Sequence, residues 1–182
     1  MSKHKIIVLV GGISMNSLNQ KLFDFFKKEA ASALEFDQFD IKALPFYSQD
    51  IENNPPAVAV DFKNRVAASD GALFVTPEYN RSFPGVLKNA IDWASRPYGH
   101  NLWTGKPAYI IGTSPGAIGT FGAQSQLRLV LSFLDLKLLN QPECYFTFPK
   151  ELEGGKLPSP AKDFVKLCAT KFAEWVANSA SK

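Results

Sequence analysis

The feature that most constrains this chain is an apolar strand that runs into a proline-containing polar loop and then into a helix. Residues 71–75 (Gly-Ala-Leu-Phe-Val) form a short apolar run that is typical of a buried strand. The loop at residues 76–80 reads Thr-Pro-Glu-Tyr-Asn, and apolar residues then recur at helical spacing over residues 84–94. Open α/β sheets bind ligands where such strands end, so we expect this loop to face a ligand.

The chemistry of this loop favours binding over catalysis, because it offers no evident nucleophile. Pro77 fixes one backbone dihedral angle, so that the amides and carbonyls around it are held in place before a ligand arrives. A rigid row of backbone donors and acceptors suits a flat heteroaromatic ring with amide-like edges. We therefore interpret the loop as part of a cofactor-binding site.

Strand and helix patterns alternate along the whole chain, without a repeat or an internal linker. We expect strands at 5–10, 36–41, 71–75, 107–113 and 137–139, the last resuming at 144–146, and helices at 16–33, 61–69, 84–95, 123–134 and 160–179. Five strand–helix units predict a single α/β domain over residues 1–182, built on a doubly wound five-stranded parallel sheet with helices on both faces. Ligands of such a sheet bind at the carboxyl ends of its strands.

A second candidate site lies in the first strand–helix turn, residues 11–19, which read Gly-Gly-Ile-Ser-Met-Asn-Ser-Leu-Asn. Free N–H groups and the helix dipole make such a helix start an anion site. The turn lacks both the lysine of a P-loop and the G-x-G-x-x-G spacing, so a terminal phosphate monoester fits it better than a triphosphate or a pyrophosphate. Serine and asparagine also serve as ordinary helix caps, and this alternative stays open.

A third loop, at residues 112–116, matches the G-x-S-x-G pattern of serine hydrolases. Two observations argue against that enzyme class. The chain has only His4 and His100, which both precede Ser114, whereas the hydrolase order places the histidine last. Pro115 has no N–H to donate to an oxyanion. We expect residues 114–119 to form a third ligand-facing loop, in which Ser114, Gly116 and Gly119 permit the close approach of a ring, with a plain turn as the alternative.

Composition excludes several other classes. The net charge is only +3 and the lysines are scattered, so a nucleic-acid surface is not predicted. No apolar stretch approaches the roughly 20 residues of a membrane span. Cys144 and Cys168 form no CxxC motif, so neither a disulfide framework nor a metal site is indicated. We expect a cytoplasmic protein that binds neither nucleic acid nor membranes.

Two helices and one loop leave alternatives open. Residues 123–134 are apolar nearly all round, which fits either a subunit interface or a central position in the core. Residues 160–179 carry one apolar stripe, which favours packing on the sheet over a membrane-surface role. Tyr98, His100 and Trp103 either line a substrate mouth or face solvent.

These residues resemble the NADPH-dependent FMN reductases, a flavodoxin-like family that includes bacterial quinone and chromate reductases. The resemblance covers nearly the whole chain and is most specific at residues 77–80 followed by 84–93, with further matches at Ser17-x-Asn19 and at residues 133–135. It implies strand order 2-1-3-4-5, non-covalently bound FMN, and a homodimer or homotetramer.

The resemblance also implies which residues bind FMN. They fall into three groups, for the phosphate, for the ring edge and for the other side of the ring: Ser14, Ser17, Leu18 and Asn19; Pro77, Glu78, Tyr79 and Asn80; and Ser114 and Gly116. Two positions depart from the family pattern. Ser14 and Gly122 stand where the family often carries arginines, the first near the phosphate and the second at a tetramer or nicotinamide-phosphate contact.

From this resemblance we hypothesise that NADPH or NADH passes hydride to the flavin and that a quinone or a similar small acceptor then collects two electrons. The flavin carries the chemistry, so no catalytic side chain and no metal is expected. The alternative is a flavodoxin-like electron carrier without its own NAD(P)H turnover. Such carriers usually present acidic faces, whereas this chain has a positive net charge.

Overall fold

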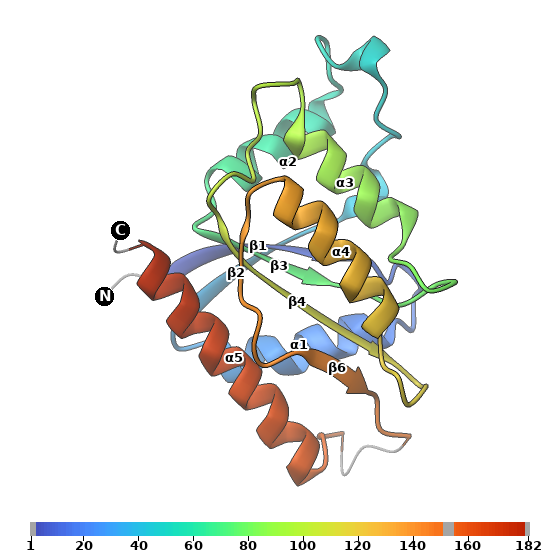
Figure 1. The fold of residues 1–182 in the computed structure, drawn as a ribbon, viewed down its shortest axis with the longest axis vertical. Helices are drawn as coiled ribbons and strands as arrows, with labels where there is room; N and C mark the ends of the chain where they lie inside the picture. The colour runs from blue at the N-terminus through green and yellow to red at the C-terminus, as the bar shows by residue number, and fades with distance from the viewer. Residues whose placement is uncertain (1–2, 151–154, 181–182) are drawn as a thin grey trace.

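The computed structural model describes residues 3–150 and 155–180, in which one sheet lies between two layers of helices (Figure 1). The strands are β1 (His4–Val10), β2 (Leu34–Phe39), β3 (Gly71–Val75), β4 (Pro107–Ser114), β5 (Lys137–Leu138) and β6 (Cys144–Thr147). The α-helices are α1 (Leu18–Ala30), α2 (Ala57–Ala67), α3 (Gly85–Ser95), α4 (Phe121–Phe133) and α5 (Ser159–Ala180), and two short 3₁₀ helices are η1 (Ile41–Ala43) and η2 (Gln49–Ile51).

The sheet is parallel, with strand order β2-β1-β3-β4-β5. Two short strands occupy its fifth position in turn. β5 pairs with the first residues of β4, and β6 pairs with its last residues, up to the pair of Ser114 and Thr147. The predicted order 2-1-3-4-5 is confirmed, as is the interrupted fifth strand. This order leaves the carboxyl ends of β1, β3 and β4 side by side.

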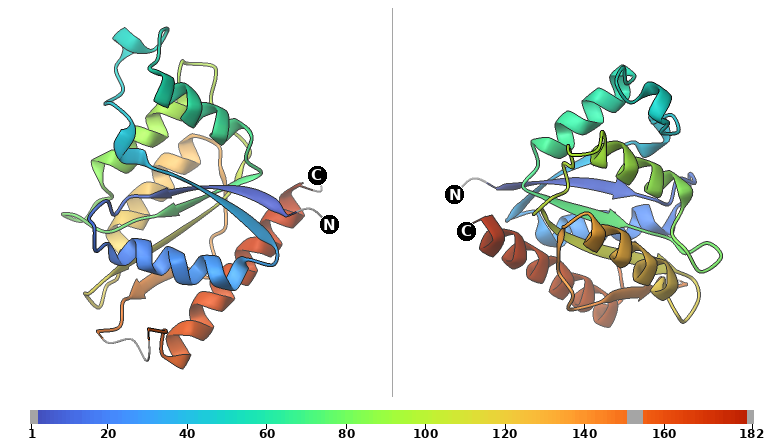
Figure 2. Two further views of the ribbon diagram at one scale, coloured as in Figure 1. Left: turned by 180° about the vertical axis from the view of Figure 1, so that it is seen from behind. Right: turned by 45° about the horizontal axis from the view of Figure 1, so that its top comes forward.

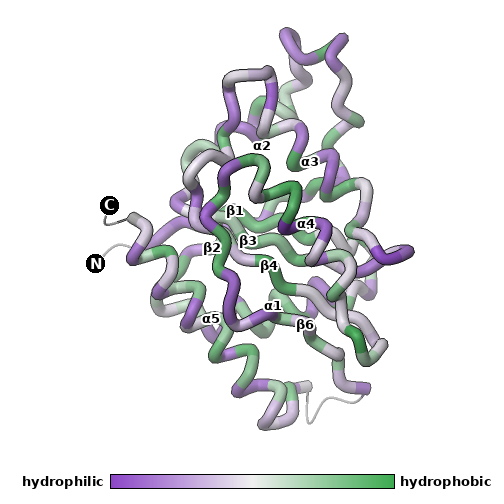
Figure 3. Tube along the Cα trace, viewed as in Figure 1, coloured by the Kyte–Doolittle hydropathy of each residue, from purple (hydrophilic) through white to green (hydrophobic). Residues whose placement is uncertain are grey.

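Both faces of the sheet are covered, which explains why its strands are continuously apolar. Successive side chains of β1 point to opposite faces, so that Ile6 and Val8 pack with α1 and α5, whereas Ile7 and Leu9 pack with α2, α3 and α4. Figure 2 shows the same two layers of helices from two further directions. In Figure 3 the hydrophobic colour follows the central strands and gives way to polar segments at the periphery.

Most predicted boundaries hold to within two residues, and the largest shift concerns α2. The helix was predicted at 61–69 but begins at Ala57, because the carbonyl of Pro56 already accepts hydrogen bonds from two N–H groups of the first turn. Strand β2 was predicted at 36–41 but ends before Asp40. The carboxylate of Asp40 accepts a hydrogen bond from the N–H of Lys42 and so begins η1 instead.

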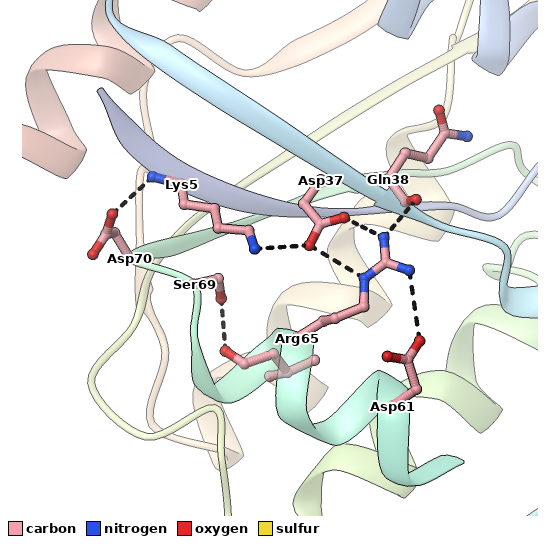
Figure 4. A network of polar contacts seen from close by, with 8 residues as sticks. Lys5, Asp37, Gln38, Asp61, Arg65, Ser69 and Asp70 are labelled. Atoms are coloured by element: carbon pink, nitrogen blue, oxygen red, sulfur yellow. Dashed lines mark hydrogen bonds and ion pairs between the residues drawn. The ribbon is translucent and has the colours of Figure 1, made fainter. Parts of the chain in front are cut away.

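A polar network joins α2 to the end of β2 (Figure 4). The guanidinium of Arg65 donates hydrogen bonds to the carboxylate of Asp37 and, at 3.0 Å, to the carbonyl of Gln38. Lys5 approaches the same carboxylate at 3.3 Å. The hydrogen bond from Arg65 is the main cause that lowers the pKa of Asp37, because it stabilises the ionised form. The network thereby holds the carboxyl end of β2 against α2.

The hypothesis that loop aromatics line a substrate mouth is wrong for Trp103. Its side chain is fully buried between α2, α3 and the sheet, and its indole N–H donates to the carbonyl of Ile91 at 3.0 Å. Tyr98 is the opposite case and points into solvent. Trp103 can be buried although it lies in a loop, because its indole N–H has a backbone acceptor. The sequence pattern does not reveal that acceptor.

The structure shows which faces of α4 and α5 pack on the sheet. Helix α4 does not occupy a central position in the core, because one of its faces is exposed. In α4, Leu127 and Leu131 pack on the sheet, whereas Leu129 and Phe133 are 75% and 87% exposed. In α5, Val165 and Phe172 are buried in the core shared with α1, as the sequence favoured. Within the described ranges, none of the helices combines the length and the apolar character needed to cross a membrane.

Candidate functional site

Three loops meet at the carboxyl ends of β1, β3 and β4, and together they enclose two adjoining cavities of about 210 and 350 Å³. Glu78 and Ser114 line both cavities. The smaller cavity also includes Ser14, Ser17, Leu18, Asn19, Pro77 and Tyr79, and the larger one includes Asn80 and Gly116. The structure therefore brings all ten of the predicted site residues into one crevice.

The start of α1 borders the crevice and has the geometry of an anion site. The hydroxyl of Ser17 accepts a hydrogen bond from the N–H of Gln20 at 3.2 Å, and the N–H of Ser17 donates to the carbonyl of Ser14 at 3.1 Å. These bonds close the turn. The N–H groups of Leu18 and Asn19, in the first helical turn, have no acceptor within the helix and belong to residues that line the smaller cavity. The positive end of the helix dipole adds to their attraction for an anion.

The side chain of Asn19 has a different role from the one expected. It is only 3% exposed, and its amide makes two hydrogen bonds of 3.0 Å with the backbone of Thr113, one donated and one accepted. These two bonds tie the amide to the backbone of Thr113, while the backbone N–H of Asn19 has no acceptor within the helix. The pair of bonds fixes the first loop against the end of β4.

The loop at residues 77–80 continues into a two-residue hairpin turn. The N–H and the carbonyl of Tyr79 exchange hydrogen bonds of 2.9 Å with Ser82. The two residues between them, Asn80 and Arg81, have φ angles of 51° and 65°, as such a turn requires. The backbone N–H and carbonyl of Tyr79 are thus used in the hairpin, and its side chain is half-exposed.

Glu78 connects this hairpin to α4. One carboxylate oxygen accepts a hydrogen bond from the N–H of Ala123 at 3.1 Å, in the first turn of α4, and the other lies 3.4 Å from the guanidinium of Arg81. A Cβ atom at Gly122 would lie 3.1 Å from the carbonyl oxygen of Arg81 and 3.2 Å from the Glu78 carboxylate. The close approach of these groups gives a physical reason for glycine at position 122.

The third loop is closed by the hydroxyl of Ser114. It donates to the carbonyl of Gly119 at 2.7 Å and accepts from the N–H of Gly116 at 3.2 Å. Gly119 has a φ angle of 63°, and a Cβ there would lie 2.9 Å from the carbonyl carbon of Tyr145. Ser114 is thus a loop-closing residue, and neither histidine is among its hydrogen-bond partners, which further removes the hydrolase interpretation.

Sequence reasoning missed several residues of the crevice. Thr113 lines the smaller cavity, and its hydroxyl is buried without a hydrogen-bond partner in the part of the chain that the structure describes. A Cβ at Gly12 would lie 2.3 Å from the hydroxyl of Ser17, so that only glycine lets the first loop fold over the helix start. Arg81 and Ile118 line the larger cavity. These residues could have been found from their positions in the sequence, because each lies next to a predicted site residue or within a predicted loop.

Comparisons with known proteins agree with this geometry. Residues 4–152 match the family model described as NADPH-dependent FMN reductase. The chain belongs to this family. The reductase is 48% identical over 175 residues to a 2-hydroxy-1,4-benzoquinone reductase from Burkholderia sp, covering 94% of this chain and 96% of that protein. It is 42% identical to a quinone reductase from Pseudomonas putida, with 95% of each chain covered.

Among solved structures, the flavoenzyme FerB, an NAD(P)H:(acceptor) oxidoreductase from Paracoccus denitrificans, superposes on this reductase with a TM-score of 0.92. The two sequences are 38% identical, and the match covers 97% of this reductase and 98% of FerB.

The crevice of the reductase fits FMN. The buried hydroxyl of Thr113, which has no hydrogen-bond partner in residues 3–150 and 155–180, is a group that a polar ligand can satisfy. The helix start offers the N–H groups of Leu18 and Asn19 to a phosphate, and Gly12 leaves room for it. The larger cavity, of about 350 Å³, lies within the usual range of about 300–1,000 Å³ for a small-molecule site.

Proposed function

We propose that the crevice between the three loops is the FMN site. The start of α1 holds the phosphate, the hairpin loop after β3 lies along the ring edge, and the loop after β4 flanks the other side. The corresponding residues are Ser14, Ser17, Leu18 and Asn19; Pro77, Glu78, Tyr79 and Asn80; and Ser114 and Gly116. The observation that carries this assignment is that eight of these residues share the smaller cavity with Thr113, whose buried hydroxyl has no hydrogen-bond partner among the described residues. The other two, Asn80 and Gly116, line the adjoining cavity.

As a member of its family, the protein is an NAD(P)H-dependent, FMN-containing quinone reductase. FMN, when bound, accepts hydride from NADPH or NADH and returns two electrons to the acceptor. The protein supplies binding and orientation. The bonds between Asn19 and Thr113 and the hairpin at Tyr79 hold the loops rigid, so that little conformational entropy is lost when the cofactor binds.

The acceptor is proposed to be a quinone with an acidic hydroxyl group. The guanidinium of Arg81 lines the larger cavity and its side chain is 71% exposed, so that it remains available to an anionic oxygen. The Burkholderia relative is named for 2-hydroxy-1,4-benzoquinone, a quinone of this kind. Replacement Arg81→Gln should raise the KM for 2-hydroxy-1,4-benzoquinone about tenfold and leave the KM for neutral 1,4-benzoquinone unchanged. An equal change for both quinones would contradict this role.

The reductase is further proposed to act as a single FMN-binding domain over residues 1–182 that assembles into a homodimer or homotetramer. Large apolar side chains are exposed along the outer face of α4 and in the loop before it: Ile118, Phe121, Leu129 and Phe133. Such a gathering on a water-soluble protein favours an interface with a second copy. Cys144 and Cys168 are buried free thiols, which supports a reducing, cytoplasmic location.

A second candidate function is a flavodoxin-like electron carrier, because such carriers use the same strand order. Steady-state turnover separates the two. Purified protein with FMN should oxidise NADPH or NADH when a quinone is present and should stop when either FMN or quinone is left out. A carrier would show almost no turnover without a partner reductase, and that result would contradict the enzyme assignment.

A further inference from the structure

A third cavity, of about 320 Å³, lies beside the first loop, between that loop and the carboxyl end of β2. Gly12 and Ser14 line both this cavity and the smaller cavity of the proposed FMN site. The three cavities therefore adjoin one another along the carboxyl edge of the sheet, in the order of the strands β2, β1, β3 and β4. None of the residues proposed to hold FMN, apart from Ser14, belongs to the third cavity.

The apolar part of this cavity suits a flat ring. Val10, Phe39 and Ile41 are buried residues that form one side of it. Ile13 and Met15 line it from the loop, and these two large apolar side chains are exposed, Met15 completely. An exposed methionine and isoleucine next to a cavity leave apolar surface that a planar base can cover from above, with the buried residues beneath.

The polar part of the cavity suits a nucleoside. The side-chain amides of Gln20 and Gln38 pair with each other at 2.7 and 3.2 Å and can exchange these bonds for the donors and acceptors on the edge of a purine. Asp40 and Lys42 lie at the mouth, 3.8 Å apart, and the Asp40 carboxylate is 65% exposed. A carboxylate after the second strand of a doubly wound sheet is well placed to accept hydrogen bonds from ribose hydroxyls.

The backbone around these groups is fixed. Arg65 donates to the carbonyl of Gln38 at 3.0 Å (Figure 4). The carboxylate of Asp40 accepts a hydrogen bond from the N–H of Lys42 at 3.2 Å. Opposite charges at the mouth leave the cavity nearly neutral, so that it favours an uncharged nucleoside over a free phosphate.

We propose that this cavity binds the adenosine moiety of a dinucleotide, with the base against the exposed side chain of Met15 and the ribose at Asp40. The inference rests on the proposed function, because the shared loop at Gly12 and Ser14 connects the adenosine to the flavin crevice. Two dinucleotides carry this moiety: the donor NADPH or NADH, and FAD taken up in place of FMN. Either dinucleotide would have to extend across the first loop to occupy both this cavity and the flavin crevice.

The test is titration of the FMN-loaded protein with 5′-AMP by isothermal calorimetry. We expect one saturable site. The Asp40→Asn variant, which keeps the cap of η1, should bind 5′-AMP about tenfold more weakly because a charge-assisted hydrogen bond is lost. Met15→Glu should also weaken binding at least tenfold, since it places a charge where the base packs. The matched control is Asp61→Asn, an aspartate of similar exposure at 62%, which should bind 5′-AMP like the wild type.

Two further measurements identify the source of the adenosine. If 5′-AMP competes with NADH in steady-state turnover, and less so in Asp40→Asn, the donor occupies the cavity. If instead 5′-AMP weakens the uptake of FAD by the apoprotein but leaves the KM for NADH unchanged, FAD occupies it. Absence of 5′-AMP binding, or equal binding by all four proteins, would overturn the inference. The absorbance of bound FMN is recorded first, so that a failure of the proposed FMN site is seen separately from a failure of this cavity.

Discussion

The side-chain amide of Asn19 makes two 3.0 Å hydrogen bonds to the backbone N–H and carbonyl of Thr113, and thereby joins the first turn of α1 to the end of β4. The two residues are 94 positions apart in the chain. Both lie at the wall of the smaller cavity, next to the N–H groups that are proposed to hold the phosphate. The geometry of the crevice thus depends on a contact that a ligand does not touch.

This contact predicts the effect of Asn19→Ala. The change leaves a buried N–H and a buried carbonyl of Thr113 without partners, which should lower the free energy of unfolding of the apoprotein by about 2–3 kcal/mol. Urea unfolding followed by circular dichroism measures it, with Asn64→Ala on the surface of α2 as the control. A loss below about 0.5 kcal/mol would show that the pair of bonds does not hold the two loops together.

Ser17 is predicted to act both as a helix cap and as part of the phosphate site. Ser17→Ala should cost about 1 kcal/mol of stability through the lost cap and should also weaken FMN binding about tenfold. Ser48→Ala is a matched control, because the hydroxyl of Ser48 caps η2 outside the crevice. Fluorescence titration with FMN distinguishes the two variants, and equal FMN affinities would remove Ser17 from the phosphate site.

The exposed face of α4 predicts a change in assembly. Phe133→Glu introduces a charge on the most exposed large apolar residue of that helix and should shift the protein from dimer or tetramer to monomer in analytical ultracentrifugation. Leu167→Glu, on the outer side of α5, is the control and should leave the assembly unchanged. Should wild-type protein already sediment as a monomer at micromolar concentration, the proposed interface would be wrong.

The network around Arg65 predicts how stability depends on pH. The pKa of Asp37 is lower in the folded protein than in the unfolded chain, chiefly because Arg65 donates hydrogen bonds to the carboxylate. Its contribution is therefore present above the unfolded pKa of about 3.9 and is lost as the pH falls through the folded pKa.

In urea unfolding at pH 7 and at pH 3, Asp37→Asn should be less stable than the wild type at the higher pH, and the difference should shrink at the lower pH. Asp163→Asn, at an exposed position of α5 without an ion pair in the described residues, serves as the control. A difference between Asp37→Asn and the wild type that stays constant over this range would contradict the role of the Arg65 hydrogen bond.

The alternation of strands and helices and the three loops were predictable because they depend on local patterns, whereas the strand order was implied by the resemblance to the FMN reductases. The strands β1, β3 and β4 are apolar without interruption, whereas a strand with one exposed face would alternate apolar and polar residues. Pro77 and the glycine pair before Ile13 mark the turns that follow two of these strands. Parallel strands with helical crossovers then leave few possible arrangements, and all of them place these turns at one edge.

The hydrogen-bond partners of individual polar side chains were not predictable from local patterns. Asn19 was expected at the phosphate and Ser114 in a loop beside the ring, but the sequence did not indicate that the amide of Asn19 bonds the backbone of Thr113 or that the hydroxyl of Ser114 closes its own loop. Such choices depend on contacts between residues that the chain brings together only when folded. The third cavity was missed because it depends on Asp40, which ends β2 two residues earlier than the apolar pattern indicates.

The most direct test of the central claim is a titration of the purified apoprotein with FMN, followed by absorbance between 350 and 550 nm and by flavin fluorescence. If the three loops form the flavin site, FMN binds at one equivalent per chain, with quenched or shifted emission, and Ser17→Ala shifts the curve about tenfold to higher concentration. The assignment of the crevice would be contradicted if the protein stayed colourless after removal of free FMN. It would also be contradicted if the Ser17→Ala and Asn80→Ala variants bound FMN as tightly as the wild type.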